Sequence, residues 1–326
     1  IGFESTAHYA LNLELFLENA HHSFMEVNPV LIKEYKKSTT LRRTKTDSVD
    51  CESIARWLIT VEYKPHSKGF YHAYSLKSLT RLRDRLIRQR SFYLVKITNV
   101  LDHTFPEFKP FFNERLSKTA LYLLENYGSA EKMARMNSAS YDKLRCISRG
   151  KFSIQQFLRL KELAANTVGV NNSIFDLELN TLLTLYKSLS DEINTLETEI
   201  IKLIEEVHPH YMSIPGIGPI SSAVIYAEYG DISNFSNPGQ MLAFAGIEPG
   251  INDSGTESHG GRMVKHGSSQ LRYVLLNACL PLIRFDLTFA TYYEKKRAEG
   301  KKHRVAITHV AKKLIRVIYA LERQDV

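Results

Sequence analysis

Apolar residues recur along the middle of the chain in alternating steps of four and three. The series consists of Leu182, Tyr186, Leu189, Ile193, Leu196, Ile200, Leu203 and Val207. This spacing is typical of the seam of a left-handed coiled coil, so it predicts a long helix that packs against another helix. A helix expected over residues 76–101 is a candidate partner within the chain, and a second copy of the chain is the alternative.

Shorter apolar segments alternate over the first 60 residues. The pattern predicts a strand at 1–4, a helix at 9–20, a strand at 23–27 and helices at 30–37 and 47–60. Strand, helix and strand in this order indicate an α/β layer. The abrupt start on an apolar strand also leads us to expect that residues upstream of Ile1 are missing.

Glycine usage separates the rest of the chain into two parts. Ten of the sixteen glycines lie between Gly216 and Gly267, whereas only three fall between residues 71 and 205, so the middle is predicted to be helical. The predicted domains are 1–70 (α/β), 71–207 (helical, coiled coil) and 208–326 (mostly helical). The last predicted element is an amphipathic helix around Val305, Val310, Leu314 and Val317.

Charge and cysteine content narrow the function classes. The chain has 43 Lys and Arg against 35 Asp and Glu, a formal charge of +8, which favours a polyanionic partner. Cys51, Cys146 and Cys279 are scattered, which excludes a CxxC zinc site and a disulfide framework and favours a reducing cytoplasm. The longest apolar run, 274–283, is about half of a membrane span, so no membrane partner is expected.

Three carboxylates are candidates for chemistry. Asp47 and Asp50 are three residues apart, so they would share one face at the start of a helix, and Glu4 ends the first strand. Converging carboxylates repel one another unless a cation is present, and oxygen ligands suit Mg²⁺ or Mn²⁺. The three side chains therefore predict a metal site for phosphoryl transfer. The alternative is that Asp47 merely caps the helix or interacts with its dipole.

Two basic segments could bind nucleic acid, and the first of them would hold it beside this site. The first segment comprises Lys33, Lys36, Lys37, Arg42, Arg43 and Lys45, and the second comprises Arg81, Arg83, Arg85, Arg88 and Arg90. Arginine binds phosphate through paired donors, and Phe92 and Tyr93 follow the second segment. A solvated helix surface is the alternative for that segment.

The sequence IPGIGP at 214–219 resembles a helix-hairpin-helix turn. Gly216 and Gly218 would allow the backbone to approach a phosphate closely, and the amides of the helix starting near Pro219 could bind it. Such a turn contacts the DNA backbone without reading bases. A purely structural tight turn is the alternative.

The following segment, 245–278, has too many glycines to be predicted as helix or strand. It contains Ser254 as a candidate nucleophile, and a serine hydroxyl needs a base or a metal to activate it. The candidate phosphate-binding and proton-transferring residues of this segment are Arg262, Lys265, Arg272, His259 and His266. From composition alone, a polar loop is the alternative.

Several short motifs, taken in order, resemble the insertion-sequence one-ten family of transposases. They are ESTAHY at 4–9, VNP at 27–29, KTDSVD at 45–50, IPGIGP at 214–219, AGIEPG at 245–250, SG at 254–255 and KHGSSQLR at 265–272. The resemblance implies a RuvC-like domain of ribonuclease-H fold with a DEDD carboxylate set, followed by a domain with a serine nucleophile. Glu4, Asp47 and Asp50 match E, D and D, Ser254 matches the serine, and the first aspartate would lie upstream of Ile1 in a truncated domain.

The resemblance further implies transposition or recombination of DNA, directed by a structured guide RNA and carried out by a homo-oligomer, a dimer or tetramer. It places the protein in a prokaryotic cytoplasm, associated with the nucleoid. Two other hypotheses stay open on the residues alone. One is a metal-dependent nuclease in which Ser254 is a bystander, and the other is a truncated remnant that only binds nucleic acid.

Overall fold

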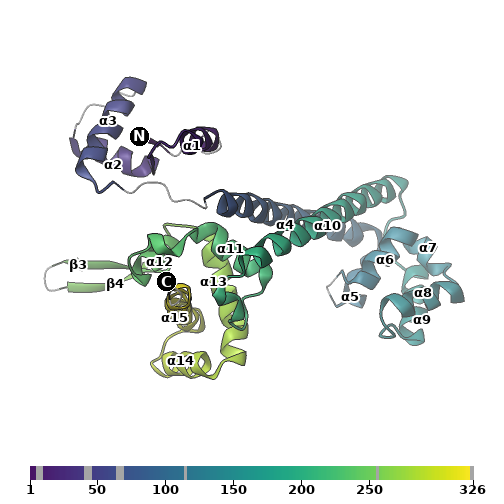
Figure 1. The fold of residues 1–326 in the computed structure, drawn as a ribbon. Coiled ribbons are helices and arrows are strands. Elements are labelled where there is room, and N and C mark those ends of the chain that lie inside the picture. The colour runs from purple at the N-terminus through teal and green to yellow at the C-terminus, as the bar shows by residue number, and fades with distance from the viewer. Residues whose placement is uncertain (5–9, 40–45, 64–69, 114–115, 255–256, 324–326) are drawn as a thin grey trace. The chain divides into compact units, whose positions relative to one another are not determined.

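The computed structural model describes residues 1–4, 10–39, 46–63, 70–113, 116–254 and 257–323, and the side chains of residues 70–72, 249 and 251–262 lie outside the described part (Figure 1). The chain divides into two compact units, Ile1–Phe70 and Tyr71–Val326. Each unit is described by itself below. The predicted division into domains at 1–70, 71–207 and 208–326 stays a prediction.

The N-terminal unit has the predicted order of strand, helix and strand. Its elements are β1 (Gly2–Glu4), α1 (Ala10–Asn19), β2 (Met25–Val27), α2 (Pro29–Thr39) and α3 (Asp47–Thr60). The two strands pair in parallel, with Phe3 opposite Glu26. A parallel pair needs a crossover, and α1 supplies it. The expected α/β layer is therefore present as a two-stranded sheet with three helices.

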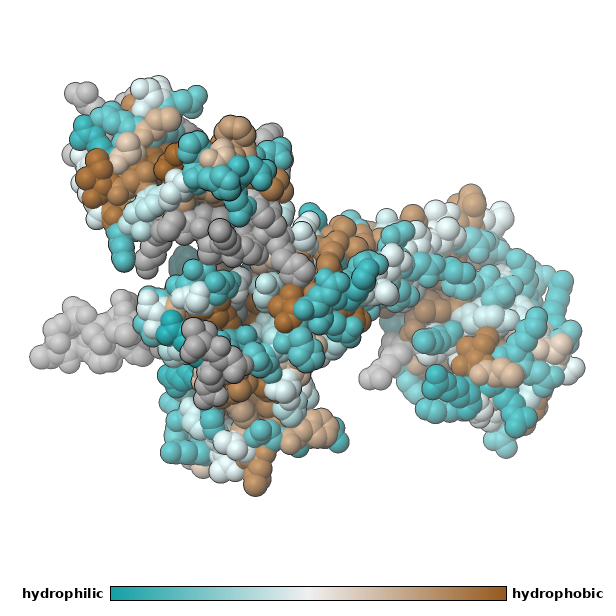
Figure 2. All heavy atoms as spheres, viewed as in Figure 1, coloured by the Kyte–Doolittle hydropathy of each residue, from teal (hydrophilic) through white to brown (hydrophobic). Residues whose placement is uncertain are grey.

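A small apolar core holds this unit together. Phe3 stacks on Phe24 with ring centroids 5.8 Å apart, and Val27 and Ile32 are buried. Helix α3 packs against β1 so closely that a Cβ on Gly2 would lie 2.2 Å from Leu58 Cδ1. Large apolar side chains also reach the surface of the unit, as the brown atoms in Figure 2 show. The exposed set includes Phe16, Val30, Leu31 and Ile59.

The second unit is mainly helical. Its first helices are α4 (Phe70–Thr104), α5 (Phe108–Phe111), α6 (Lys118–Tyr127), α7 (Ala130–Ala134), α8 (Ser138–Ile147), α9 (Ile154–Ala165) and α10 (Ser173–Val207). The elements that follow are η2 (His210–Ser213), α11 (Pro219–Tyr229), η3 (Ile232–Asn234), α12 (Pro238–Ala245), β3 (Pro249–Ser254), β4 (Glu257–Met263), α13 (Ser269–Phe285), α14 (Leu287–Ala298) and α15 (His303–Arg323).

The predicted long helix is α10, and its partner within the chain is α4. The side chains of Arg83 and Glu197 pair near one end, and His103 stacks on Phe175 near the other, so the two helices run antiparallel (Figure 1). Ile193 is buried on the predicted seam. Supercoiled geometry and a seam with a second copy stay predictions.

Helices α5–α9 form a small helical cap on the α4–α10 pair. Their starts follow local sequence rules: the side chains of Asn137 and Ser140 cap α8 reciprocally, and those of Ser153 and Gln156 do the same for α9. The caps satisfy backbone amides that would otherwise lack partners. The group of helices α5–α9 therefore depends on these capping boxes as well as on its apolar cluster.

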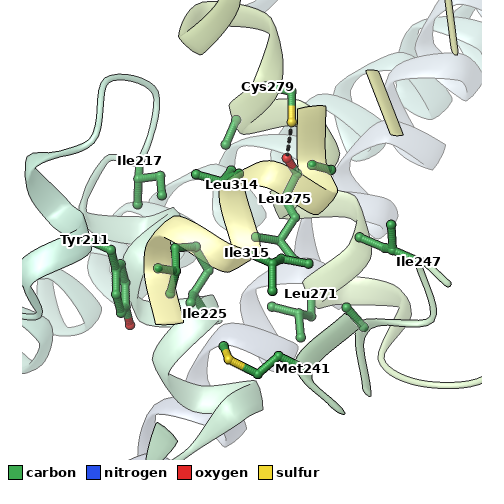
Figure 3. Packing of buried hydrophobic residues seen from close by; sticks show 14 of the residues in the cluster. Tyr211, Ile217, Ile225, Met241, Ile247, Leu271, Leu275, Cys279, Leu314 and Ile315 are labelled. Carbon is green, nitrogen blue, oxygen red and sulfur yellow. Dashed lines mark hydrogen bonds between the residues drawn. The ribbon is translucent and has the colours of Figure 1, made fainter. Parts of the chain in front are cut away.

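The C-terminal helices enclose the largest apolar core, shown in Figure 3. Leu314 and Ile315 of α15 lie at its centre, between Ile225 of α11 and Leu271 and Leu275 of α13. The predicted amphipathic helix is thus confirmed, with one correction. Its buried face is centred on Ile307, Val310, Ala311, Leu314 and Ile318, and Val305 is exposed.

The glycine-rich segment contains an antiparallel hairpin, so our expectation that it forms neither helix nor strand was wrong. Strands β3 and β4 pair from Pro249 opposite Met263 to Ser254 opposite Glu257, with a register shift between Pro249 and Ile251. Backbone hydrogen bonds form a ladder whatever the side chains are, and a bulge tolerates glycine. Composition alone therefore missed the hairpin.

No single helix in the described ranges is both long and apolar enough to cross a membrane. Within those ranges, α13 and α14 reach the length and apolar composition of a span only when taken together, and they are bent by 105° relative to each other.

Candidate functional site

Helix α3 begins with a threonine cap that leaves Asp47 available. The Thr46 side chain accepts a hydrogen bond from the Val49 amide, and its backbone is extended, as expected for an N-cap residue. Asp47 and Asp50 both lie in the first turn of the helix. The alternative that Asp47 is the cap is therefore wrong, although its charge still interacts favourably with the helix dipole.

Asp50 already has a cationic neighbour in the same unit. The Lys36 ammonium from α2 forms an ion pair with Asp50 Oδ1, and both side chains are about one quarter exposed. The Oδ1 atom itself is shielded from solvent. A shielded carboxylate oxygen requires a positive charge beside it, and here a lysine supplies that charge.

Glu4 ends β1, the strand on which α3 packs, so the three predicted ligands belong to one unit. Within the described ranges, however, no three His, Cys, Asp or Glu side chains lie close enough to share a metal ion. The donors fit a hard divalent cation in type, because all are carboxylates and Asp50 offers a shielded oxygen. The structure therefore does not bring Glu4, Asp47 and Asp50 together, and their role as metal ligands stays a prediction.

Sequence reasoning overlooked a buried carboxyl group on α1. Glu14 is only 1% exposed, and burial, with a smaller contribution from the Glu26 carboxylate, raises its pKa to about 7. A signal was present, because Glu14 occupies the same helix face as Ala10 and Leu17, which are buried. The group is protonated in part at neutral pH.

The arginines predicted to bind nucleic acid on α4 differ in their surroundings. Arg81 binds Glu228 of α11 through two hydrogen bonds of 2.9 and 3.1 Å. Arg88 pairs with Asp84 one turn away and is largely exposed, at 73%. Arg85 is exposed and makes no ion pair with a described residue. Arg81 therefore holds α4 to α11, and nucleic-acid contact by Arg85 and Arg88 stays a prediction.

The two glycines of the IPGIGP turn have different roles. Gly216 adopts a φ of +96°, and a Cβ there would lie 2.7 Å from the Ala278 carbonyl oxygen of α13. Gly218 has ordinary dihedrals, open space around its Cα and no side-chain cap on the helix that it precedes. The element before the turn is the short η2, so a helix-hairpin-helix is not confirmed. Contact between Gly218 and a phosphate remains a prediction.

Ser254 is the last paired residue of β3, next to the tip of the hairpin. Among the predicted partners in this segment, the side chains of Arg262 and His259 lie outside the described part, whereas Lys265 and His266 are exposed. The Arg272 guanidinium donates to the Ala245 carbonyl oxygen at 3.2 Å. Arg272 thus secures the end of α12. Arg42, Arg43 and Lys45 also lie outside the described residues.

Comparisons with known proteins identify the family. Residues 1–106 match a transposase model of the DEDD type from IS110, and residues 209–294 match the model described as the transposase IS116/IS110/IS902 family. The two models together match more than half of the chain. The chain belongs to the IS110/IS116/IS902 transposase family.

Individual relatives agree with this assignment at low identity. An IS110 uncharacterized 43.6 kDa protein of Streptomyces coelicolor is 28% identical over 237 residues, which is 70% of this chain and 58% of that protein. An IS900 uncharacterized 42 kDa protein of Mycobacterium paratuberculosis is 28% identical over 86% of this chain and 71% of its own length. The transposase of element IS1111A from Coxiella burnetii is 25% identical over 79% and 59%. The chain thus spans between 58% and 71% of these relatives.

Proposed function

We propose that this chain cleaves and rejoins DNA during transposition of an insertion sequence, with a RuvC-like N-terminal unit. The observation that carries the proposal is the start of α3, where Asp47 and Asp50 share one turn of a helix packed on the strand that ends in Glu4. This helix lies inside the region matched by the DEDD transposase model. Carboxylates arranged on neighbouring elements suit phosphoryl transfer assisted by divalent metal.

Asp50, whose Oδ1 is shielded, would be the first ligand of the ion, and Glu4 and Asp47 would have to move toward it, because the three carboxylates do not lie close enough to share an ion in the structure. A bound Mg²⁺ or Mn²⁺ would neutralise charge on the phosphate and favour ionisation of the attacking hydroxyl. Lys36 would then serve two purposes. It balances the charge of Asp50 before the ion binds, and its ammonium is afterwards available to a phosphate oxygen beside the site.

Ser254 is the proposed nucleophile. Its Oγ forms a bond to phosphorus while the bond from phosphorus to the 3′ oxygen breaks, and the 3′ oxygen takes up a proton. The hydroxyl proton passes to a base, for which His259 and His266 are the candidates in this segment. Reversal of the same step with a new 3′ hydroxyl rejoins the DNA.

A trapping experiment tests the nucleophile. The chain is incubated with Mg²⁺ and labelled DNA that carries the ends of its insertion element, and protein-linked DNA is separated under denaturing conditions. We expect an adduct with the wild type and with Ser258→Ala, which removes a hydroxyl from the same hairpin, but none with Ser254→Ala. Cleaved DNA without any adduct would instead show that metal-activated water attacks, as in a nuclease.

Metal binding can be tested without activity. Trp57 is the only tryptophan, and it follows Asp50 by seven residues, roughly 10 Å along α3, so it can sensitise the luminescence of bound Tb³⁺. We expect Asp50→Asn to weaken Tb³⁺ binding by more than tenfold, and Lys36→Met to strengthen it by about threefold to tenfold because a competing cation is removed. Glu52→Gln on the same helix is the control. Equal affinities in all three variants would refute the site.

Guide RNA and oligomer formation belong to the same proposal. Exposed Arg85 and Arg88 on α4 support contact with RNA, and the α4–α10 pair offers a rigid arm on which copies of the chain could assemble. Serine and carboxylate groups from different copies would then act on one strand of DNA. Such an assembly would act on DNA at the nucleoid.

A further inference from the structure

Positive charge is concentrated where α14 meets α15. The segment KKRAEGKKHR, residues 295–304, contains six Lys and Arg against a single Glu, a net charge of +5 in a chain whose total is +8. It covers the end of α14, the connecting turn and the start of α15. We call the six cations of this segment the basic corner. They are Lys295, Lys296, Arg297, Lys301, Lys302 and Arg304.

Little of this charge is neutralised by the protein. Lys296 pairs with Glu299 at 2.8 Å, and the Arg297 guanidinium donates to the Lys301 carbonyl oxygen at 2.7 Å, which holds the turn in shape. The other four cations are exposed, and no described carboxylate forms an ion pair with them. Because charges this close repel one another, the corner gains free energy from an external polyanion.

A row of basic residues extends the corner along one face of α15. His309, Lys312 and Arg316 follow at spacings of three and four, so they share that face, and we call them the α15 row. Burial and the Arg316 charge lower the pKa of Lys312, and burial with Lys312, Lys296 and Lys301 lowers that of His309. These mutual effects place the row within electrostatic range of the corner.

The α15 row leads toward the hairpin that carries Ser254. Ile247 is buried in the same apolar cluster as Leu314 and Ile315 of α15, and the next residue, Glu248, immediately precedes β3. The Glu248 carboxylate also opposes the lowering of the Lys312 pKa. From Arg304 to Arg316, α15 rises about 18 Å, which is the length of several phosphate spacings along a DNA strand. Lys312 and Arg316 therefore carry the positive charge of the corner toward the base of the hairpin, and His309, whose pKa is lowered, adds a polar imidazole between the corner and Lys312.

We propose that the basic corner and the α15 row form one surface that binds the phosphate backbone of duplex DNA and leads it to the β3–β4 hairpin. The positive end of the α15 dipole lies at His303, within the corner, and adds to the attraction. Lys and Arg contacts of this kind fix the position of a duplex without reading its sequence. The proposal rests on the proposed function in that the hairpin is taken as the place of DNA cleavage.

The aromatic residues beside the corner favour a duplex over unpaired RNA. Lys313 lies 5.0 Å from the Phe289 ring and 5.1 Å from the Tyr292 ring, and Lys296 also lies over Tyr292. Tyr293 is hydrogen-bonded to His303 Nδ1 at 2.8 Å. Recognition of unpaired bases depends on free aromatic faces, whereas lysines lie over the rings of Phe289 and Tyr292 and the Tyr293 ring meets His303 edge-on. The surface is therefore suited to backbone contact alone.

The test removes charge from the corner without touching the core. Lys301→Gln, Lys302→Gln and Arg304→Gln are combined in one variant, and the matched control combines Lys143→Gln, Arg145→Gln and Lys151→Gln, three exposed cations of the helical cap region. Binding of a labelled 30-base-pair DNA duplex of random sequence is followed by fluorescence anisotropy at several salt concentrations. Circular dichroism melting checks that both variants fold.

We expect the corner variant to lose about tenfold to a hundredfold in affinity at low salt, with a salt-dependence slope reduced by roughly two to three, because each phosphate contact contributes about 0.9. The control should retain wild-type binding and slope. Equal binding by the two variants would overturn the proposal. A loss confined to an RNA duplex of the same sequence would show that the surface binds RNA.

The two proposals fail in distinguishable ways. Ser254→Ala should bind the 30-base-pair duplex with unchanged affinity and slope, whatever its effect on DNA cleavage. If the wild type forms no covalent adduct but the corner variant loses DNA binding, the serine mechanism fails and the surface stands. If adducts form and the corner variant binds like the control, the surface fails and the serine mechanism stands.

Discussion

The ion pair between Arg81 and Glu228 gives the sharpest prediction about the fold, because one partner is buried and the other is not. The Glu228 side chain is 2% exposed and that of Arg81 is 48% exposed. Burial alone would raise the pKa of Glu228, but hydrogen bonds from Arg81 and Ser268 and the nearby Lys77 charge lower it overall. Glu228 is therefore ionised within the interface between α4 and α11.

Replacement of Arg81 by Met would leave this carboxylate buried without its main partner. Breaking a fully buried pair costs roughly 3–5 kcal/mol, and the exposure of Arg81 reduces the figure to about 2–3 kcal/mol because water screens the interaction. For a unit of this size, that corresponds to a melting temperature lower by about 4–10 °C. Circular dichroism at 222 nm measures it, because the unit is mainly helical.

Two further variants separate this explanation from a general effect of losing charge. Arg85→Met removes an exposed guanidinium from the same helix and should change stability by less than about 0.5 kcal/mol. Adding Glu228→Gln to Arg81→Met removes the unpaired charge and should restore at least half of the loss. The reasoning is refuted if Arg81→Met and Arg85→Met have the same melting temperature. It is also refuted if the double variant is no more stable than Arg81→Met.

The sign of the pH dependence follows from the lowered pKa of Glu228. A carboxyl group with a folded pKa below its unfolded value adds stability above the unfolded pKa, about 4.5, and this stability is lost as the pH falls through the folded pKa. As the pH falls below 5, the free energy of unfolding of Arg81→Met should therefore decrease less steeply than that of the wild type.

Two more predictions concern the glycines of the IPGIGP turn and Glu14. Gly216→Ala should lower stability by about 1–3 kcal/mol in thermal melts, because φ is +96° and the new Cβ would lie 2.7 Å from the Ala278 carbonyl oxygen. Gly218→Ala should have the melting temperature of the wild type, because a Cβ there meets open space. It should weaken DNA binding only if a phosphate approaches the Gly218 backbone. A large loss of stability in Gly218→Ala would contradict the open space seen around this residue. For Glu14, the folded pKa of about 7 exceeds the unfolded value near 4.5, so the native state holds the extra proton and its stability falls as the pH rises from 4.5 to 7. Glu14→Gln should remove this slope and raise the free energy of unfolding at pH 8 by up to about 3 kcal/mol. Urea unfolding monitored by the fluorescence of the only tryptophan measures this free energy. An unchanged slope would refute the assigned pKa.

The spacing of apolar residues predicts a helix or strand well when that element buries a single apolar face. The strands ending in Glu4 and Val27 and the long helix through Ile193 follow from the apolar pattern. The hairpin whose first strand ends at Ser254 does not, because its glycines carry no side-chain pattern and its stability comes from backbone pairing. Contacts between distant segments, such as Arg81 with Glu228, leave no periodic trace at all.

The candidate site shows the same division between local and distant information. That Asp47 and Asp50 share one turn follows from their spacing, and the structure places them so. That Lys36 faces Asp50 depends on how α2 packs against α3, which no spacing rule specifies. The charge of a residue therefore predicts its class of partner, whereas packing decides whether that partner is a phosphate or a carboxylate. On this argument Arg85 and the basic corner are better candidates for contact with nucleic acid than Arg81 or Arg272, whose donors the protein already uses. Arg85 has no described carboxylate partner, and the six cations of the corner have one, Glu299.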